Sequence, residues 1–205
     1  MTNWKQVTVD TYNKSAKELA EYFRGIGSRV KDIEKALELA GNTNNPKVLE
    51  IGCGDGRDAK EIVKRTKSYL GFDISEELIK LAKVHAPGGK FVVADAVRFN
   101  YGKDNYDVVF AFASLLHLNK SEVGDVLQKV HVALKENGVF YVSLKLANTY
   151  EEKVKDDKFG KRMFYFYNPQ VIKELAGDAY EVVDEDGGFV TVGNTKWFEM
   201  ALRKR

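Results

Sequence analysis

The sequence predicts an α/β fold in which helices cover both faces of a mostly parallel sheet. Between residues 47 and 144, short and nearly continuous apolar segments alternate with segments of helical periodicity. Strands that are apolar on both faces are typical of a parallel sheet buried between two helical layers. The first apolar segment ends in Gly52, Gly54 and Gly56, and a helical pattern follows at once. This order predicts a buried strand, a tight turn and a helix N-terminus.

The central part of the chain contains five expected strands and three expected helices. The strands are predicted at residues 47–51, 68–73, 90–94, 106–112 and 139–144. The helices are predicted at residues 57–65, 75–84 and 121–135. Ser75 is the expected N-cap of the second of these helices, with Glu76 and Glu77 in its first turn. Right-handed crossover connections then restrict the order of the strands.

Both ends of the chain are expected to add to this core. Residues 13–40 have a helical pattern that Gly25–Ser28 divides, with Ser28 as a candidate cap for the second helix. Helices in this position either cover a ligand cleft or only shield an edge of the sheet. Residues 147–161 are polar and predict a surface loop or a short mobile helix. A helix at 168–176 and strands at 180–184 and 196–203 follow, with a turn at 185–188 that predicts an antiparallel hairpin.

Composition narrows the class of protein. The 205 residues, 44% hydrophobic and 30% charged, suit one domain of ordinary size, divided into an N-terminal helical cap (1–45), a core (46–145) and a C-terminal segment (146–205). A formal net charge of +2 gives no reason to expect a nucleic-acid partner. Cys53 is the sole cysteine, so we expect no internal disulfide and a cytoplasmic location. No segment has the length and hydropathy of a membrane span, so we expect no membrane partner.

The glycine loop predicts a cradle for a nucleotide-like ligand. Glycine lets the backbone approach a ligand closely, and the free amides at a helix start suit polar or anionic groups. A nicotinamide dinucleotide site requires the spacing G-x-G-x-x-G, but Arg57 stands where its last glycine belongs. This departure argues against a dinucleotide cofactor.

The segment Glu50-Ile51-Gly52-Cys53-Gly54-Asp55-Gly56 closely resembles the signature of class I S-adenosylmethionine-dependent methyltransferases. Four later segments match the family in order: 71–75, 95–96, 106–109 and 134–138, the last departing from the usual proline-glycine at Glu136-Asn137. The resemblance implies a Rossmann-like three-layer sandwich. Its seven-stranded sheet has the order 3-2-1-4-5-7-6, with the last strand antiparallel and the N-terminal helices over the cleft.

The resemblance also implies which residues bind the cofactor. Asp73 takes the place of the acid that accepts hydrogen bonds from both ribose hydroxyls, and Asp95 that of the residue beside the adenine amino group. Glu50 takes the place of an acid that helps to hold the methionine amino group, and Tyr12 that of an aromatic residue that covers the cofactor. The full predicted set is Tyr12, Glu50, Gly52, Cys53, Gly54, Gly56, Asp73, Ile74, Asp95, Ala96 and Ala113. Several of these residues have a structural alternative. The glycines could only form a turn, with Cys53 as a small residue among them. Asp73 could merely precede the cap Ser75, Asp95 could be a loop acid, and Glu50 a satisfied polar residue at a strand end.

Two further segments point to the methyl acceptor. His117 follows the fourth strand, where similar enzymes place a histidine that acts as a base or positions the substrate. The alternative is a packed histidine satisfied by a backbone carbonyl. In related enzymes an arginine-aromatic segment lines the acceptor pocket, which makes Arg162, Tyr165 and Tyr167 candidates. The same alternation of aromatic residues is equally what a short strand packed on the core would show.

The predicted activity is therefore transfer of a methyl group from S-adenosylmethionine to an O, N or S nucleophile of a small molecule, releasing S-adenosylhomocysteine. The chain lacks the proline motif of exocyclic base methylases and the acceptor-side cysteine of cytosine methylases, so nucleic-acid bases are disfavoured. A transfer RNA or protein acceptor, and a non-catalytic cofactor-binding module, remain alternatives. No metal site is expected, and monomer and dimer are both open.

Overall fold

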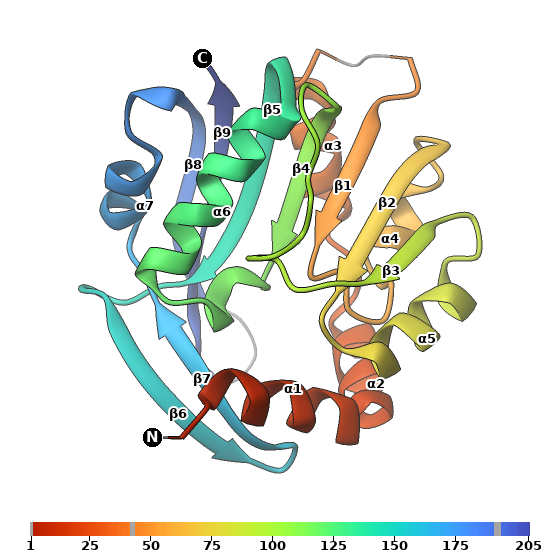
Figure 1. Ribbon diagram of the computed structural model, residues 1–205, viewed down its shortest axis with the longest axis vertical. Helices are drawn as coiled ribbons and strands as arrows, with labels where there is room; N and C mark the ends of the chain where they lie inside the picture. Colours follow the sequence, from red (N-terminus) through yellow and green to blue (C-terminus); the bar gives the residue numbers. More distant parts are fainter. Residues whose placement is uncertain (1, 42–43, 191–193) are drawn as a thin grey trace.

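The computed structural model describes residues 2–41, 44–190 and 194–205, and its centre is a seven-stranded sheet (Figure 1). The strand order is β3-β2-β1-β4-β5-β9-β8. The strands are β1 (Lys47–Ile51), β2 (Ser68–Asp73), β3 (Lys90–Val93), β4 (Tyr106–Phe112), β5 (Leu134–Lys145), β8 (Tyr180–Val190) and β9 (Lys196–Lys204). The first five are parallel, and β9 pairs antiparallel with both β5 and β8. The predicted order and the antiparallel last strand are confirmed.

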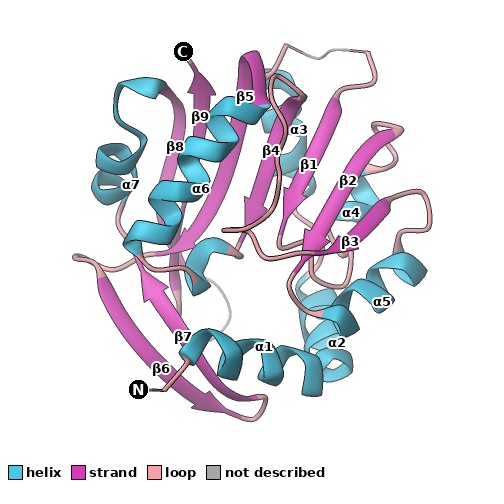
Figure 2. Ribbon diagram, viewed as in Figure 1, coloured by secondary structure: helices cyan, strands magenta, loops and turns pink. Residues whose placement is uncertain are grey.

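Helices pack on both faces of this sheet (Figure 2). They are α1 (Trp4–Lys14), α2 (Ala16–Ile26), α3 (Val30–Leu39), α4 (Ala59–Ile62), α5 (Glu76–His85), α6 (Lys120–Ala133) and α7 (Pro169–Ala176). Because side chains alternate along a strand, Leu49 joins the core under α6 and α7, whereas Val48 joins the core under α3, α4 and α5. Both side chains are fully buried. Burial of each such side chain stabilises the fold by about 2 kcal/mol.

The topology creates a crevice at the carboxyl ends of the parallel strands. The chain runs from β1 outward to β2 and β3, then crosses back to β4 on the other side of β1. The loops that follow β1 and β4 therefore leave the sheet in opposite directions, and the space between them is where open α/β sheets bind ligands. Figure 1 shows α1 lying across this edge of the sheet.

Three local predictions were wrong at the N-terminal side. Helix α1 begins at Trp4, so Tyr12 lies inside a helix rather than ahead of the first one. The helix predicted at 57–65 is limited to α4, because the first residues after the loop form turns. The chain does break at Gly27, whose φ is 88°, but the N-cap of α3 is Arg29. Ser28 instead donates a hydrogen bond to the Arg57 carbonyl at 2.7 Å.

The predicted loop or helix at 147–161 was also wrong. This region contains β6 (Glu151–Asp157), which pairs antiparallel with β7 (Gly160–Phe166) as a separate two-stranded hairpin. The polar sequence of β6 hides the strand, because most of its side chains are exposed. The turn expected at 185–188 lies within β8, where the pairing is irregular between Gly187 and Phe189. Residues 191–193, between β8 and β9, lie outside the described residues.

Hydrogen bonds fix α1 against β7. The Thr11 hydroxyl donates to the Lys161 carbonyl at 2.7 Å, and the Met163 amide donates to the Thr8 hydroxyl at 3.0 Å. Both threonines are buried. The helix and the hairpin therefore form one cover over the crevice. No helix among the described residues has both the length and the apolar character needed to cross a membrane.

Candidate active site

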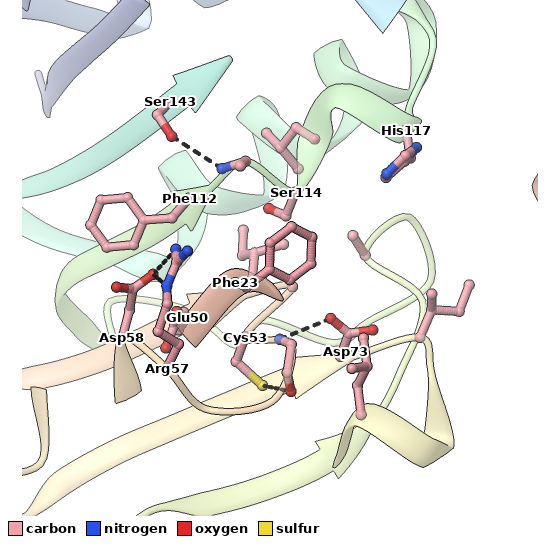
Figure 3. Close-up of a pocket in the computed structure, with 18 of the residues that line it drawn as sticks. Phe23, Glu50, Cys53, Arg57, Asp58, Asp73, Phe112, Ser114, His117 and Ser143 are labelled. Atoms are coloured by element: carbon pink, nitrogen blue, oxygen red, sulfur yellow. Dashed lines mark hydrogen bonds and ion pairs between the residues drawn. The ribbon is translucent and has the colours of Figure 1, made fainter. Parts of the chain in front are cut away.

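A cavity of about 430 Å³ lies at the carboxyl ends of β1, β2 and β4, under α1, α2 and α3 (Figure 3). Its volume falls in the range of sites that hold a cofactor-sized molecule. Most residues predicted from the sequence line it: Tyr12, Glu50, Gly52, Cys53, Gly54, Asp73, Ile74, Asp95, Ala96, Ala113 and His117. The fold thus brings together side chains from both halves of the sheet.

The three loop glycines have different structural reasons for being glycine. All have positive φ: 68° at Gly52, 55° at Gly54 and 81° at Gly56. A Cβ on Gly52 would lie 2.3 Å from the Ser114 Cβ, so this glycine lets the β1 and β4 loops touch. A Cβ on Gly56 would meet Ala82 of α5, and Gly56 is not among the cavity-lining residues. Of the three glycines, only Gly54 has open space where a Cβ would lie, and it forms part of the cavity wall.

Asp73, at the end of β2, is held by backbone amides. Gly54 N–H donates to one carboxylate oxygen at 3.0 Å (Figure 3). Ser75 N–H donates to the other at 2.8 Å. Burial raises the pKa of Asp73, and the amide hydrogen bonds oppose that shift. The carboxylate can accept further hydrogen bonds, because each oxygen has two lone pairs. It is therefore fixed and still able to bind a pair of ligand hydroxyls.

Glu50, at the end of β1, is a buried acid. It is 2% exposed, and the Tyr69 hydroxyl donates to its Oε2 at 2.5 Å. Burial and the negative charge of Asp58 raise its pKa well above the usual range. A ligand cation near this carboxyl group would favour the ionised form. Glu50 is thus suited to a positively charged group such as an amine.

An ion-pair cluster behind the glycine loop was not predicted from the sequence. Asp58 is buried and accepts hydrogen bonds from the backbone amide and the guanidinium of Arg29, each at 2.9 Å, and from Arg57 Nη2 at 2.6 Å. The Arg29 guanidinium also lies 5.3 Å from the centre of the Phe112 ring. Breaking a buried pair of this kind is costly, because a buried charge is left without a partner. The cluster joins the start of α3 to the loop after β1.

Asp95 is paired rather than free. Lys5 of α1 lies 2.8 Å from one carboxylate oxygen, and the Val97 amide donates to the other at 2.9 Å. The Lys5 ammonium also lies 3.5 Å from Glu122. Helix α1 is therefore anchored by charge at the place where the resemblance puts the adenine base.

His117 is fixed through both ring nitrogens. Its Nδ1 lies 2.6 Å from the Met163 carbonyl, and its Nε2 lies 2.8 Å from the Tyr12 hydroxyl. Because a carbonyl only accepts, Nδ1 must carry the hydrogen, and the Tyr12 hydroxyl donates to Nε2. Burial and the positive charges of Lys145 and Arg162 lower the pKa of His117 to about 3. The ring is therefore neutral near pH 7 and holds Tyr12 in place.

This lowered pKa predicts an acid-sensitive fold. The stability that His117 contributes is complete above its unfolded pKa of about 6.5 and is lost as the pH falls toward 3. Between pH 7 and pH 4 we expect the free energy of unfolding of His117→Gln to fall by about 3 kcal/mol less than that of the wild type. Urea unfolding at the two pH values measures this difference. Equal losses in both proteins would contradict the assigned neutral ring.

The other acceptor candidates do not reach the cavity. Arg162 is 5% exposed and pairs with Asp157 at 2.5 Å, and its guanidinium lies 5.5 Å from the Tyr12 ring centre. Tyr167 is fully buried and donates to the Leu118 carbonyl at 2.6 Å. Tyr165 and Tyr167 contact the ring of Tyr150. None of these three candidates lines the cavity. The segment is the packed strand β7, which was the alternative interpretation of its aromatic alternation.

Four residues at the far end of the cavity were missed by sequence reasoning: Asp32, Ser143, Trp197 and Glu199. They lie on α3, β5 and β9. The only signal was Glu199 itself, an acid in the otherwise apolar segment Phe198–Leu202. Across the described residues, no group of three or more His, Cys, Asp or Glu side chains is arranged to hold a metal ion.

Comparison with known families indicates the class of protein to which this cavity is similar. Residues 48–138, from β1 to the start of β5, match the family model described as a methyltransferase domain. This segment, which is less than half of the chain, is similar to methyltransferase domains. Its limits enclose the glycine loop, Asp73, Asp95 and His117, and residues outside the segment complete the cavity wall.

Curated relatives of the methyltransferase domain align over part of their length. An uncharacterized methyltransferase of Synechocystis is 24% identical over 115 residues, which make up 56% of this chain and 54% of that protein. A sterol 24-C-methyltransferase of Gibberella zeae is 32% identical over 103 residues, or 47% of this chain and 27% of that protein. The chain thus spans about half or less of the length of these relatives.

A solved structure extends the similarity of fold beyond the methyltransferase domain. The 1,6-didemethyltoxoflavin-N1-methyltransferase of Burkholderia thailandensis superposes with a TM-score of 0.71 at 17% identity. The match covers 96% of this chain and 86% of that chain. The helical cover and the C-terminal strands therefore belong to the shared fold.

Proposed function

We propose that this protein is an S-adenosylmethionine-dependent methyltransferase that acts on a small-molecule acceptor. The observation that carries the proposal is the single cavity that joins the glycine loop and Asp73 to a polar end formed by α3, β5 and β9. One ligand bound at the loop and a second bound at the polar end would meet between them. Helix α1, which hydrogen bonds to strand β7 hold in place, covers this space, and this cover favours a small acceptor.

The residues present fit the cofactor. Asp73 offers two fixed oxygens for the ribose hydroxyls, and Asp95 with Ala96 and Ile74 lies where the base would bind. Gly54 leaves open space for the ligand, and Glu50 is placed to receive the methionine amine. When bound, S-adenosylmethionine supplies an electrophilic methyl group on a sulfonium sulfur. The protein then has to align the acceptor and exclude water.

Tyr12 and His117 suit the alignment step. The hydrogen bond between them is fixed by the Met163 carbonyl, so the Tyr12 ring has one orientation in the cavity wall. A fixed aromatic ring excludes water and limits the poses that an acceptor can take. We assign His117 the role of positioning Tyr12, which differs from both roles considered from the sequence, a base or a residue that positions the substrate itself.

The acceptor class can be tested with labelled cofactor. Purified protein and S-adenosylmethionine labelled in the methyl group are incubated separately with a metabolite fraction, a transfer-RNA fraction and a protein fraction of a cell lysate. We expect label to enter the metabolite fraction, and the Asp73→Ala variant to transfer none. Label confined to RNA or protein would contradict the small-molecule acceptor while supporting methyl transfer.

A further inference from the structure

The polar end of the cavity contains a carboxyl group without a role in cofactor binding. Glu199 lies on β9, is 8% exposed, and lines the cavity with Ser143 and Trp197. Antiparallel pairing places Glu199 opposite Ser143 of β5, at the end of the sheet where the crevice opens. Its neighbours in sequence, Phe198 and Met200, are fully buried. Glu199 is thus an acid in an apolar strand with its side chain at the cavity.

Glu199 shares a hydrogen-bond donor with a second acid. The Tyr141 hydroxyl lies 3.1 Å from Glu199 Oε2 and 3.5 Å from Asp32 Oδ1. One hydroxyl has one hydrogen and cannot satisfy two carboxylates at once. Burial and the negative charge of Asp32 raise the pKa of Glu199 to about 7. Glu199 therefore has a higher proton affinity than an ordinary glutamate.

The charged groups around Glu199 come from helix α3 and strand β8. Arg29 at the start of α3 favours ionisation of both acids, but its guanidinium is already paired with Asp58. On β8, Asp186 lies opposite Glu199 in the sheet register, and Asp184 pairs with Lys35 of α3 at 2.9 Å. These groups leave Glu199 as a proton-binding site rather than as half of a permanent ion pair.

An unpaired hydroxyl lies in the wall of the same cavity. The Ser114 Oγ, at the end of β4, is buried and has no hydrogen-bond partner among the described residues. Ser114 lines the cavity (Figure 3). A buried polar atom without a hydrogen-bond partner destabilises the fold. The unpaired Ser114 hydroxyl therefore indicates that a polar group of a ligand binds beside it.

His117 is a poor base in comparison. Its Nδ1 hydrogen is bound to a carbonyl, its Nε2 accepts from Tyr12, and Lys145 and Arg162 disfavour a positive ring. A general base is most effective when its pKa lies near the working pH. Of the two groups, Glu199 meets this condition and His117 does not.

We propose that Glu199 is the catalytic base, which takes the proton of an O–H or N–H nucleophile bound at the polar end of the cavity. The inference rests on the proposed function. As the bond between the nucleophile and the methyl carbon forms, the bond from that carbon to sulfur breaks, and the proton of the nucleophile passes to a Glu199 carboxylate oxygen. The products are the methylated acceptor, S-adenosylhomocysteine and a neutral Glu199, which returns its proton to water. Tyr141 and Asp32 are positioning residues that set the proton affinity of Glu199.

Carbon-13 NMR of glutamate side-chain carboxyls tests the proposal without an acceptor. In the complex with S-adenosylhomocysteine, we expect one resonance that titrates with a midpoint near pH 7 and disappears in Glu199→Gln. Asp32→Asn should move that midpoint to lower pH, because a nearby negative charge is removed. If the resonance lost in Glu199→Gln has the midpoint of an ordinary glutamate, the proposal is wrong. Failure of the wild type to bind S-adenosylhomocysteine would instead refute the proposed function.

The rate of labelled methyl transfer to the metabolite fraction gives the second test. We expect the wild-type rate to rise with pH through about 7, and Glu199→Gln to lower it by about 100-fold and remove the rise. Tyr141→Phe removes only the hydroxyl group, so the variant should fold like the wild type. We expect it to shift the midpoint of the pH profile while keeping most of the rate. A Glu199→Gln variant with the wild-type rate and pH profile would overturn the proposal.

Discussion

Replacing Asp73 by alanine is expected to weaken the binding of S-adenosylhomocysteine by at least about 100-fold. Two hydrogen bonds from the ribose hydroxyls to a carboxylate contribute about 1.5–3 kcal/mol each, and both are lost together. The variant also releases the Gly54 and Ser75 amides, which Asp73 now holds at 3.0 and 2.8 Å. Isothermal calorimetry measures the change in the dissociation constant.

The matched control for this experiment is Asp178→Ala. Asp178 is exposed, lies in the short turn after α7, and does not line the cavity. We expect this variant to bind S-adenosylhomocysteine like the wild type. If Asp73→Ala also binds like the wild type, the carboxylate after β2 is not the ribose ligand, and the orientation assigned to the cofactor is wrong.

Replacing Gly52 by alanine is expected to lower the free energy of unfolding by about 3 kcal/mol. The new Cβ would lie 2.3 Å from the Ser114 Cβ, and relief of that overlap requires a shift of the β4 loop that costs about 1–3 kcal/mol. The backbone φ of 68° adds about 1 kcal/mol for a residue that has a Cβ. Urea unfolding followed by circular dichroism measures the loss.

Gly54→Ala separates these two costs. Its φ of 55° carries the same conformational penalty, but the added Cβ meets no atom within 4 Å. We therefore expect a loss of only about 1 kcal/mol in stability, with weaker cofactor binding because the methyl group enters the cavity. Equal destabilisation by the two substitutions would show that contact with the β4 loop is not what requires glycine at position 52.

The strands of the core were predictable because their signals are local, whereas their order was taken from the resemblance to class I methyltransferases. Strands β1 and β4 are nearly continuous apolar segments, and the glycines after β1 occupy positions where positive φ is required. The position of Asp73 at the end of β2 likewise follows from the chain itself. The cavity-lining residues taken from these strand ends needed no knowledge of distant contacts.

Helix α1 was missed because its buried residues are not apolar. It buries Thr8 and Thr11 and holds them through hydrogen bonds to β7, so the sequence has no hydrophobic stripe to find. Strand β6 was missed for a related reason, since its exposed side chains resemble those of a loop. Both elements pack on β7. This strand is more than 100 residues from α1 in the sequence. For β6, the partner strand is itself ambiguous in sequence.

The polar end of the cavity depends on contacts that sequence patterns do not encode. Glu199 acquires its character from Tyr141 and Asp32, which come from a different strand and a helix. His117 was found from its place after β4, but the tautomer and the lowered pKa follow from Met163, Tyr12 and burial. Charge and proton affinity are properties of the assembled site.

The most direct test of the account is calorimetric titration of the wild-type protein with S-adenosylhomocysteine. The structure predicts saturable binding of one molecule per chain in the cavity formed by the glycine loop and Asp73. Absence of binding under conditions in which the protein is folded would contradict the assignment of this cavity as the cofactor site, and with it the proposed methyl transfer.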